Sequence, residues 1–310
     1  MKVPIFRRIG KSTGEAIKST GFQILVCLGE MMHYQHISAR PVSGVIGAEV
    51  SGVDLASSLA PRTVAEIRQA LLEYNVVFLR GQELTAEQFL AFAQQLGEPS
   101  EYPLLPGLPG YPMITPVVKR ENETMNFGGV WHSDTTYLPQ PPMATLLLAR
   151  AVPAVGGDTL FTNMYAAYDT LSDGMKRLLS RLVGVSSSRK ADAMRTREDR
   201  VSEAGRPNSD IELIGEHPVV RTHPETGRKA LYLNIAHTVK FVGMTEEESA
   251  PILHYLHEHS VRPEFTCRFS WAVGSMAIWD NRCTMHNPVN DYHGYLRKMD
   301  RITLRGDTPR

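Results

Sequence analysis

The spacing of hydrophobic residues predicts few helices and many short strands. Apolar residues recur every three or four positions in residues 63–75, 85–97, 172–184 and 245–259, as in amphipathic helices. Elsewhere the apolar residues form short runs separated by glycine, proline and polar turns, as in VVFLRGQ, MITPVVKR, ATLLLARAV, EFTCRFSW, SMAIWDN and RKMDRITLRG. Residues 217–234 carry two such runs around PETG, which predicts a β-hairpin.

Local signals predict where two of the early helices begin. Thr63 with Glu66 and Thr85 with Gln88 have the spacing of capping boxes, and Gly97 is placed to end the second helix. No alternation of strands and helices and no internal repeat is present. The pattern therefore predicts a mainly β protein, a β-sandwich or jelly roll with peripheral helices.

We predict one domain over residues 34–310, preceded by an extension over residues 1–33. We interpret the extension as a disordered tail or the result of an upstream start. An organelle-targeting segment is the alternative, because such segments are also basic and poor in acidic residues. Residues 186–216 are polar and aperiodic, which indicates either a lid or a disordered excursion.

Charge and composition exclude several classes of partner. The 33 basic and 33 acidic residues give a formal net charge of zero, so no global field attracts nucleic acid or an anionic membrane. No apolar run is long enough to span a bilayer. The three cysteines show no CxxC spacing and fit a reducing compartment, so we predict a cytoplasmic protein. The sequence leaves the oligomeric state open, a homo-oligomer included.

Candidate metal ligands occur in WHSDTTY, at His132 and Asp134. On a strand, residues two apart point to the same face, so this imidazole and this carboxylate could act together. His286, after the strand-like run SMAIWDN, offers a third ligand. Two histidines and one carboxylate form the facial triad of non-haem Fe(II) oxygenases, although HxD alone is a weak signal.

Four longer motifs resemble, in order, those of the taurine dioxygenase superfamily: WHSDTTYLPQPP, GGDTLFTNMYAAYDTLS, HPVVRTHPETGRKALYLN and IWDNRCTMHNPVNDY. The resemblance extends from about residue 42 to residue 307 and implies a double-stranded β-helix (jelly roll) fold. It also implies an Fe(II)- and 2-oxoglutarate-dependent dioxygenase, which uses O2 and releases succinate and CO2.

The resemblance also implies roles for individual residues. His132, Asp134 and His286 match the iron ligands, Thr159 matches the threonine that binds 2-oxoglutarate, and Arg297 matches the arginine that pairs with its distal carboxylate. A guanidinium can hold a carboxylate through two parallel hydrogen bonds.

Arg301 follows Arg297 at strand spacing and should share its face of the last strand. In the taurine branch this position binds the substrate's sulfonate, so Arg301 is predicted to bind a small anionic substrate. A salt bridge to Asp300 or Asp307 is the alternative.

Two departures make taurine itself a poor substrate candidate. Tyr102 stands where the taurine enzymes have a histidine, and Gly128 stands where they have an asparagine. FTCRFSW and WDNRCTMHNPVNDYHG are closer to the aryloxyalkanoate dioxygenases, which hydroxylate the carbon beside an ether oxygen. We therefore predict an aryloxyalkanoate-like substrate contacting Tyr102, with an alkylsulfonate or alkyl sulfate as the alternative.

Two other functions use the same residues. A zinc hydrolase could employ the three ligands and a bound water, but Thr159 and Arg297 would then have no role. A non-catalytic β-barrel binding protein would be expected to have lost a ligand or the arginine, and this chain keeps them all.

Overall fold

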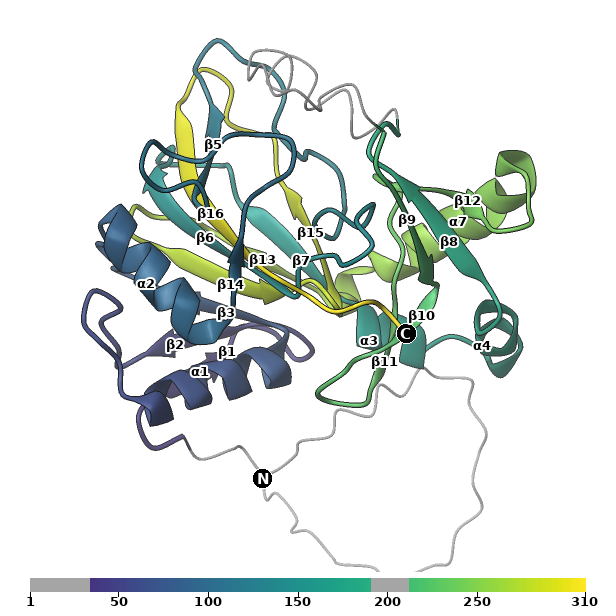
Figure 1. Cartoon of the computed structure of the whole chain (residues 1–310), viewed down its shortest axis with the longest axis horizontal. Helices are drawn as coiled ribbons and strands as arrows, with labels where there is room; N and C mark the ends of the chain where they lie inside the picture. The colour runs from purple at the N-terminus through teal and green to yellow at the C-terminus, as the bar shows by residue number, and fades with distance from the viewer. Residues whose placement is uncertain (1–33, 191–211) are drawn as a thin grey trace, which may run out of the picture. The chain divides into compact units, whose positions relative to one another are not determined.

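The protein is described by a computed structural model that covers residues 34–190 and 212–310 (Figure 1). The predicted extension over residues 1–33 lies outside the described residues and stays a prediction, as does the domain boundary. The two ends of the aperiodic segment 186–216 belong to a pair of strands, β8 (Val183–Ser187) and β9 (Ile214–Pro218), and residues 191–211 are outside the described part.

The larger sheet has the strand order β1-β2-β3-β14-β6-β16-β4, and β5 also pairs with β16. Its strands are β1 (Ser38–Pro41), β2 (Ala48–Ser51), β3 (Val76–Leu79), β4 (Pro99–Ser100), β5 (Thr115–Lys119), β6 (Ala144–Ala151), β14 (Met276–Asp280) and β16 (Arg297–Leu304). All these pairs are antiparallel except β2 with β3.

The second sheet is β13-β7-β15. Its strands are β7 (Thr159–Asn163), β13 (Thr266–Phe269) and β15 (Thr284–Pro288). A further sheet contains β8 (Val183–Ser187), β9 (Ile214–Pro218) and β12 (Thr238–Phe241), and the predicted hairpin forms from β10 (Val220–Thr222) and β11 (Lys229–Leu231). The helices are α1 (Pro61–Tyr74), α2 (Ala86–Leu96), α3 (Met164–Asp169), α4 (Asp173–Leu179), α7 (Glu246–Ser260) and a 3-10 turn at Pro263–Phe265.

The larger sheet is buried on both faces. Leu146 and Leu148 of β6 pack in the core that includes α1 and α2, whereas Leu147 and Ala149 pack in the core shared with β7 and β13. This alternation explains why the central strands are apolar without interruption. Burying each leucine stabilises the fold by about 1.5–3 kcal/mol. The metal ligands predicted from the sequence lie in and beside the second sheet.

One of the two predicted capping boxes forms and the other does not. Thr85 and Gln88 form the predicted box at α2, and Thr245 and Glu248 form another at α7. The box predicted at Thr63 and Glu66 is wrong, because α1 begins earlier, at Pro61. Glu66 instead accepts hydrogen bonds from three backbone N–H groups, those of residues 35–37.

Candidate metal centre and substrate pocket

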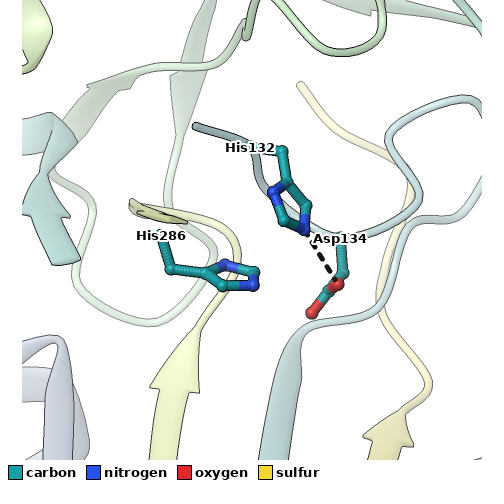
Figure 2. Close-up of side chains that lie close together, drawn as sticks. All are labelled: His132, Asp134 and His286. Carbon is teal, nitrogen blue, oxygen red and sulfur yellow. Dashed lines mark ion pairs between the residues drawn. The ribbon is translucent and has the colours of Figure 1, made fainter. Parts of the chain in front are cut away.

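Two histidines far apart in the sequence are placed side by side by a single pair of backbone hydrogen bonds. The N–H of His132 donates to the carbonyl of His286 at 3.0 Å, and the N–H of His286 donates back at 2.8 Å. Their imidazole ring centres are 4.2 Å apart. The side chains of His132, His286 and Asp134 converge on one point (Figure 2).

Asp134 is held by hydrogen bonds and not by strand geometry. The expectation that His132 and Asp134 occupy one β-strand is wrong, because the chain turns after His132 and Thr135 has a φ of +44°. The Thr145 hydroxyl donates to Asp134 Oδ2 at 2.6 Å, while Oδ1 lies 3.8 Å from His132 Nε2. Asn281 Oδ1 accepts from the Asp134 backbone N–H, which fixes the turn itself.

The charges of this cluster suit metal binding. Burial alone raises the pKa of Asp134, but the neighbouring imidazoles and the Arg301 guanidinium outweigh it and lower this pKa to about 2. Burial, together with the nearby His132, lowers the pKa of His286 to about 3. At neutral pH the cluster therefore offers a carboxylate and a neutral imidazole, the protonation states that a metal requires.

The geometry also fits a facial triad. One ligand atom from each of the three residues lies within 4.8 Å of the other two. His132 Nδ1 hydrogen-bonds to the Val130 carbonyl at 2.7 Å, which assigns the proton to Nδ1 and leaves Nε2 as the ligand atom. Two nitrogen donors and one oxygen donor are typical of Fe(II) sites that keep other positions open.

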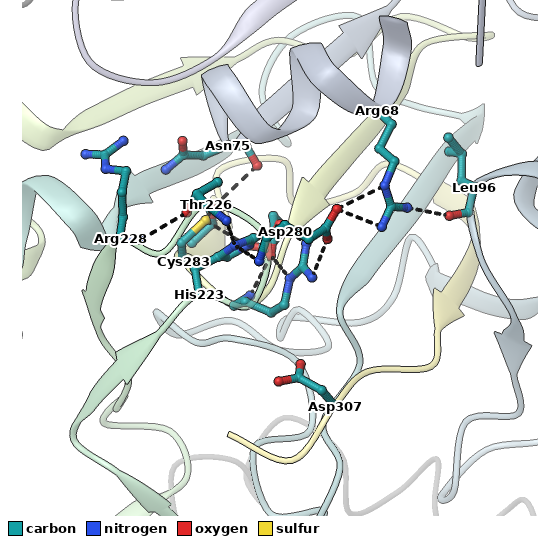
Figure 3. A network of polar contacts seen from close by, with 12 residues as sticks. Arg68, Asn75, Leu96, His223, Thr226, Arg228, Asp280, Cys283 and Asp307 are labelled. Carbon is teal, nitrogen blue, oxygen red and sulfur yellow. Dashed lines mark hydrogen bonds and ion pairs between the residues drawn. The ribbon is translucent and has the colours of Figure 1, made fainter. Parts of the chain in front are cut away.

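A second group of possible ligands, found among the described residues, does not fit a metal. His223, Asp280 and Cys283 lie close together (Figure 3), but both Asp280 oxygens accept hydrogen bonds from Arg282. His223 Nε2 donates to Asp280 at 3.0 Å, because its Nδ1 accepts from two backbone N–H groups. Burial raises the pKa of the Cys283 thiol, which stays protonated. This network fixes the turn between β14 and β15, and thereby the strand that carries His286.

Replacing Asp280 by asparagine is expected to destabilise the fold by about 3–5 kcal/mol, because Arg282 then stays buried with a weakened partner. Urea unfolding measures the change. Burial alone would raise the pKa of Asp280, but Arg282 and His223 outweigh the effect of burial and lower this pKa. The contribution of the Asp280 carboxylate to the stability of the fold is therefore present at neutral pH. It is lost as the pH falls below the unfolded pKa of about 3.9. Asp169→Asn, which removes an exposed ion pair with Arg228, is the control and should change little. Equal losses would contradict the role of the buried network.

Beside the metal cluster lies a pocket whose lining includes Thr159, Arg297 and Arg301. Arg297 is buried, and its Nε and Nη2 atoms have no hydrogen-bond partner among the described residues. Burial lowers the pKa of this guanidinium. Unpaired buried donors are costly, so the pocket is built to receive an acceptor group. The structure thus brings together the two residues that the sequence suggested for 2-oxoglutarate.

An adjoining pocket joins the metal cluster to an aromatic surface. Arg301 lies in both pockets, with its Cζ atom 4.2 Å from the centre of the Tyr102 ring. Phe127, Tyr137 and His237 complete much of the lining. Gly128 belongs there too, with a φ of +69°, and a Cβ atom added to it would lie 3.0 Å from the His132 ring.

Arg297 and Arg301 lie on the same face of β16, as their spacing predicted, and both line the pocket beside the metal cluster. The predicted alternative, a salt bridge of Arg301, named the wrong carboxylates, because Asp300 pairs with Arg150 and Asp307 with Arg221. Arg301 forms its ion pair with Asp134, whose Oδ1 atom lies 3.6 Å from the guanidinium. The Nε and Nη2 atoms of Arg301 have no hydrogen-bond partner among the described residues.

Comparison with known proteins decides the family. A family model described as "Taurine catabolism dioxygenase TauD, TfdA family" matches residues 38–303. The chain belongs to this family. A sulfate ester dioxygenase of Pseudomonas putida, described as alpha-ketoglutarate-dependent, is 35% identical over 89% of this chain and 92% of its own length. The alpha-ketoglutarate-dependent 2,4-dichlorophenoxyacetate dioxygenase of Cupriavidus pinatubonensis is 33% identical over 87% and 98%. A crystal structure of a taurine dioxygenase from Burkholderia xenovorans superposes with a TM-score of 0.75, at 39% identity over 89% and 91%.

Membership of the TauD, TfdA family confirms the predicted jelly roll and the class of enzyme, a 2-oxoglutarate-dependent dioxygenase. It also confirms the predicted cofactors, Fe(II), 2-oxoglutarate and O2. No helix in residues 34–190 or 212–310 is long and apolar enough to cross a membrane. The cytoplasmic location and a homo-oligomeric state stay predictions.

The sequence analysis did not identify three residues that line these pockets, Phe127, Tyr137 and His237. It also did not identify Trp271, which contacts the pocket residue Thr159. Phe127 and Tyr137 lie close in the sequence to the ligands His132 and Asp134, and this closeness could have indicated that they line the site. His237 reaches its pocket, and Trp271 reaches Thr159, only through the pairing of distant segments, which no local pattern reveals.

Proposed function

We propose that this TauD-family enzyme hydroxylates a small organic anion that has an apolar body, with His132, Asp134 and His286 as the iron ligands. The observation that carries the proposal is the position of Arg301. Its guanidinium is buried between the metal cluster and the aromatic pocket, with two nitrogen atoms unpaired in the described structure. A charged donor in that place favours an anionic group on the substrate.

The residues of the chain divide the remaining work between them. Thr159 and Arg297 hold 2-oxoglutarate, and Arg301 holds the anionic group of the substrate. Tyr102 and Phe127 lie against the Arg301 guanidinium, at 4.2 and 5.8 Å, and pack against the apolar body while excluding water. The bound iron, O2 and 2-oxoglutarate supply the oxidising chemistry, with succinate and CO2 as coproducts.

An aryloxyalkanoate is the first candidate substrate, because aromatic side chains line the pocket around Arg301. Hydroxylation of the carbon that bears the ether oxygen gives a hemiacetal. This hemiacetal breaks its C–O bond to release a phenol and a carbonyl compound. The 33% identity to the 2,4-dichlorophenoxyacetate dioxygenase supports this candidate.

An alkyl sulfate ester is the second candidate. As in an aryloxyalkanoate, the carbon that is oxidised bears an oxygen atom and lies close to an anionic group, although here the anion is attached through that oxygen. Hydroxylation of this carbon would release sulfate and an aldehyde. The 35% identity to the sulfate ester dioxygenase supports it.

A substrate panel tests the proposal. The purified enzyme, with Fe(II) and 2-oxoglutarate, is incubated with aryloxyalkanoates, alkyl sulfates, alkylsulfonates and their neutral analogues, and succinate and the oxidised product are measured together. We expect product and succinate in equal amounts for an anion with an apolar body. Product from the neutral analogues alone would contradict the role assigned to Arg301.

Arg297→Lys is expected to raise the KM for 2-oxoglutarate about ten- to a hundredfold, because lysine cannot form two parallel hydrogen bonds with a carboxylate. The kcat at saturating 2-oxoglutarate should change much less. Initial rates over a range of 2-oxoglutarate concentrations measure both constants. An unchanged KM would show that another residue binds the distal carboxylate.

A further inference from the structure

Trp271 follows β13 and contacts Thr159, a residue that lines the proposed 2-oxoglutarate pocket. Phe269, the last residue of β13, pairs with Thr159 of β7, and the chain then carries Trp271 over that residue. The indole Nε1–H donates a hydrogen bond to Thr159 Oγ1 at 3.0 Å. Both side chains are buried, with 9% and 2% of their surface exposed.

The orientation of this indole is fixed by its packing. The Trp271 ring lies edge-on to Phe269, with ring centres 4.9 Å apart and an interplanar angle of 84°. Phe269 in turn stacks on Phe78 of β3, at 4.0 Å and nearly parallel. Because Phe78 belongs to the core between the two sheets, the indole N–H is held toward Thr159 by the sandwich itself.

This hydrogen bond constrains the Thr159 hydroxyl. A threonine hydroxyl has one hydrogen and two acceptor lone pairs. With one lone pair facing the indole N–H, the hydroxyl hydrogen must point away from Trp271. Thr159 and Arg297 line the same pocket, and Arg297 has two unpaired nitrogen donors in the described structure. The hydroxyl is thereby available as a third donor beside them.

The indole also lies near the guanidinium. The Cζ atom of Arg297 is 5.7 Å from the centre of the Trp271 ring, within the range of a cation–π interaction. Trp271 therefore contacts both residues assigned to the cosubstrate. A carboxylate, which only accepts hydrogen bonds, suits this set of donors, whereas the NH2 of a carboxamide does not.

We propose that Trp271 is a positioning residue: it orients the Thr159 hydroxyl as a hydrogen-bond donor to the distal carboxylate of 2-oxoglutarate and so favours the dicarboxylate over its distal amide. This inference rests on the proposed assignment of that pocket to 2-oxoglutarate.

The test is a double-mutant cycle read out by binding, without turnover. Calorimetry measures the affinity of the Mn(II)-loaded, full-length protein for 2-oxoglutarate and for N-oxalylglycine. Trp271→Phe and Thr159→Val should each weaken binding about three- to tenfold, the range of one hydrogen bond. The double variant should bind no more weakly than Thr159→Val alone. Thr159→Ser, which keeps the hydroxyl, should stay near the wild type.

Selectivity gives a second readout. The wild type should prefer 2-oxoglutarate to its distal amide, 2-oxoglutaramate, and Trp271→Phe should narrow this preference because the hydroxyl can then rotate and accept. If Trp271→Phe does not fold, β-(3-benzothienyl)alanine at position 271 keeps the bicyclic ring and removes only the N–H. Additive losses in the cycle, or an unchanged preference, would overturn the inference and assign Trp271 a packing role. A wild type that binds no 2-oxoglutarate would instead overturn the assignment of the pocket.

Discussion

Asp134→Ala is expected to abolish turnover and to weaken iron binding, while the protein stays folded. Asp134 is the one carboxylate of the cluster, and without it only the imidazoles of His132 and His286 remain. Two imidazoles cannot define one face of the metal or balance its charge. Succinate formation and the iron content of the dialysed protein measure the two losses, and circular dichroism checks the fold. His132→Ala and His286→Ala should behave in the same way.

Thr145→Val provides a graded comparison. It keeps the carboxylate but removes the hydrogen bond to Asp134 Oδ2, so the ligand is less well oriented. Loss of such an outer partner is expected to cost about 10–100-fold in metal affinity or activity. Iron-dependent turnover near the wild-type rate in purified Asp134→Ala would show that the metal is held elsewhere.

The sequence predicted the three residues of this cluster, but the strand geometry from which His132 and Asp134 were paired is wrong. The i, i+2 spacing of His132 and Asp134 suggested a strand, but only His132 pairs, and its partner is His286. Asp134 faces the same point because Thr145 and Asn281 hold it from other strands and turns. Residue types and motif order could therefore be read from the chain, whereas the forces that orient the side chains are contacts between distant segments.

Strand periodicity was more informative where a strand is long and buried. In β16 alternate residues point to the same face of the sheet, so Arg297 and Arg301 reach the adjoining pockets as their spacing predicted. The same periodicity could not reveal Trp271, whose hydrogen bond depends on the register between β7 and β13. At Glu66 a local signal was misleading. Its spacing from Thr63 predicted a capping box, but its carboxylate instead accepts hydrogen bonds from the backbone of residues 35–37.

The structure sharpens the expectation for Arg301. Neither Asp300 nor Asp307 pairs with it, and the nearest carboxylate is that of the metal ligand Asp134, at 3.6 Å. Tyr102 packs against its guanidinium and holds it between the two pockets. The arginine helps to keep the pKa of Asp134 low, and its Nε and Nη2 atoms have no hydrogen-bond partner among the described residues. We propose that these donors bind the substrate's anionic group.

Arg301→Ala is therefore expected to weaken binding of an anionic substrate about 30- to 1,000-fold, the cost of removing one partner of a buried charge pair. The variant should also turn over 2-oxoglutarate without oxidising the organic substrate, because the substrate is no longer held beside the metal. A neutral ester of the same substrate should lose little, since it presents no charge to the arginine. Arg301→Lys, which keeps the charge without the planar fork, should fall between the two. Product and succinate are measured for the acid and the ester in all three proteins, after metal affinity has been checked. Equal losses for acid and ester would mean that Arg301 supports Asp134 and the pocket wall, and does not bind the substrate's anionic group.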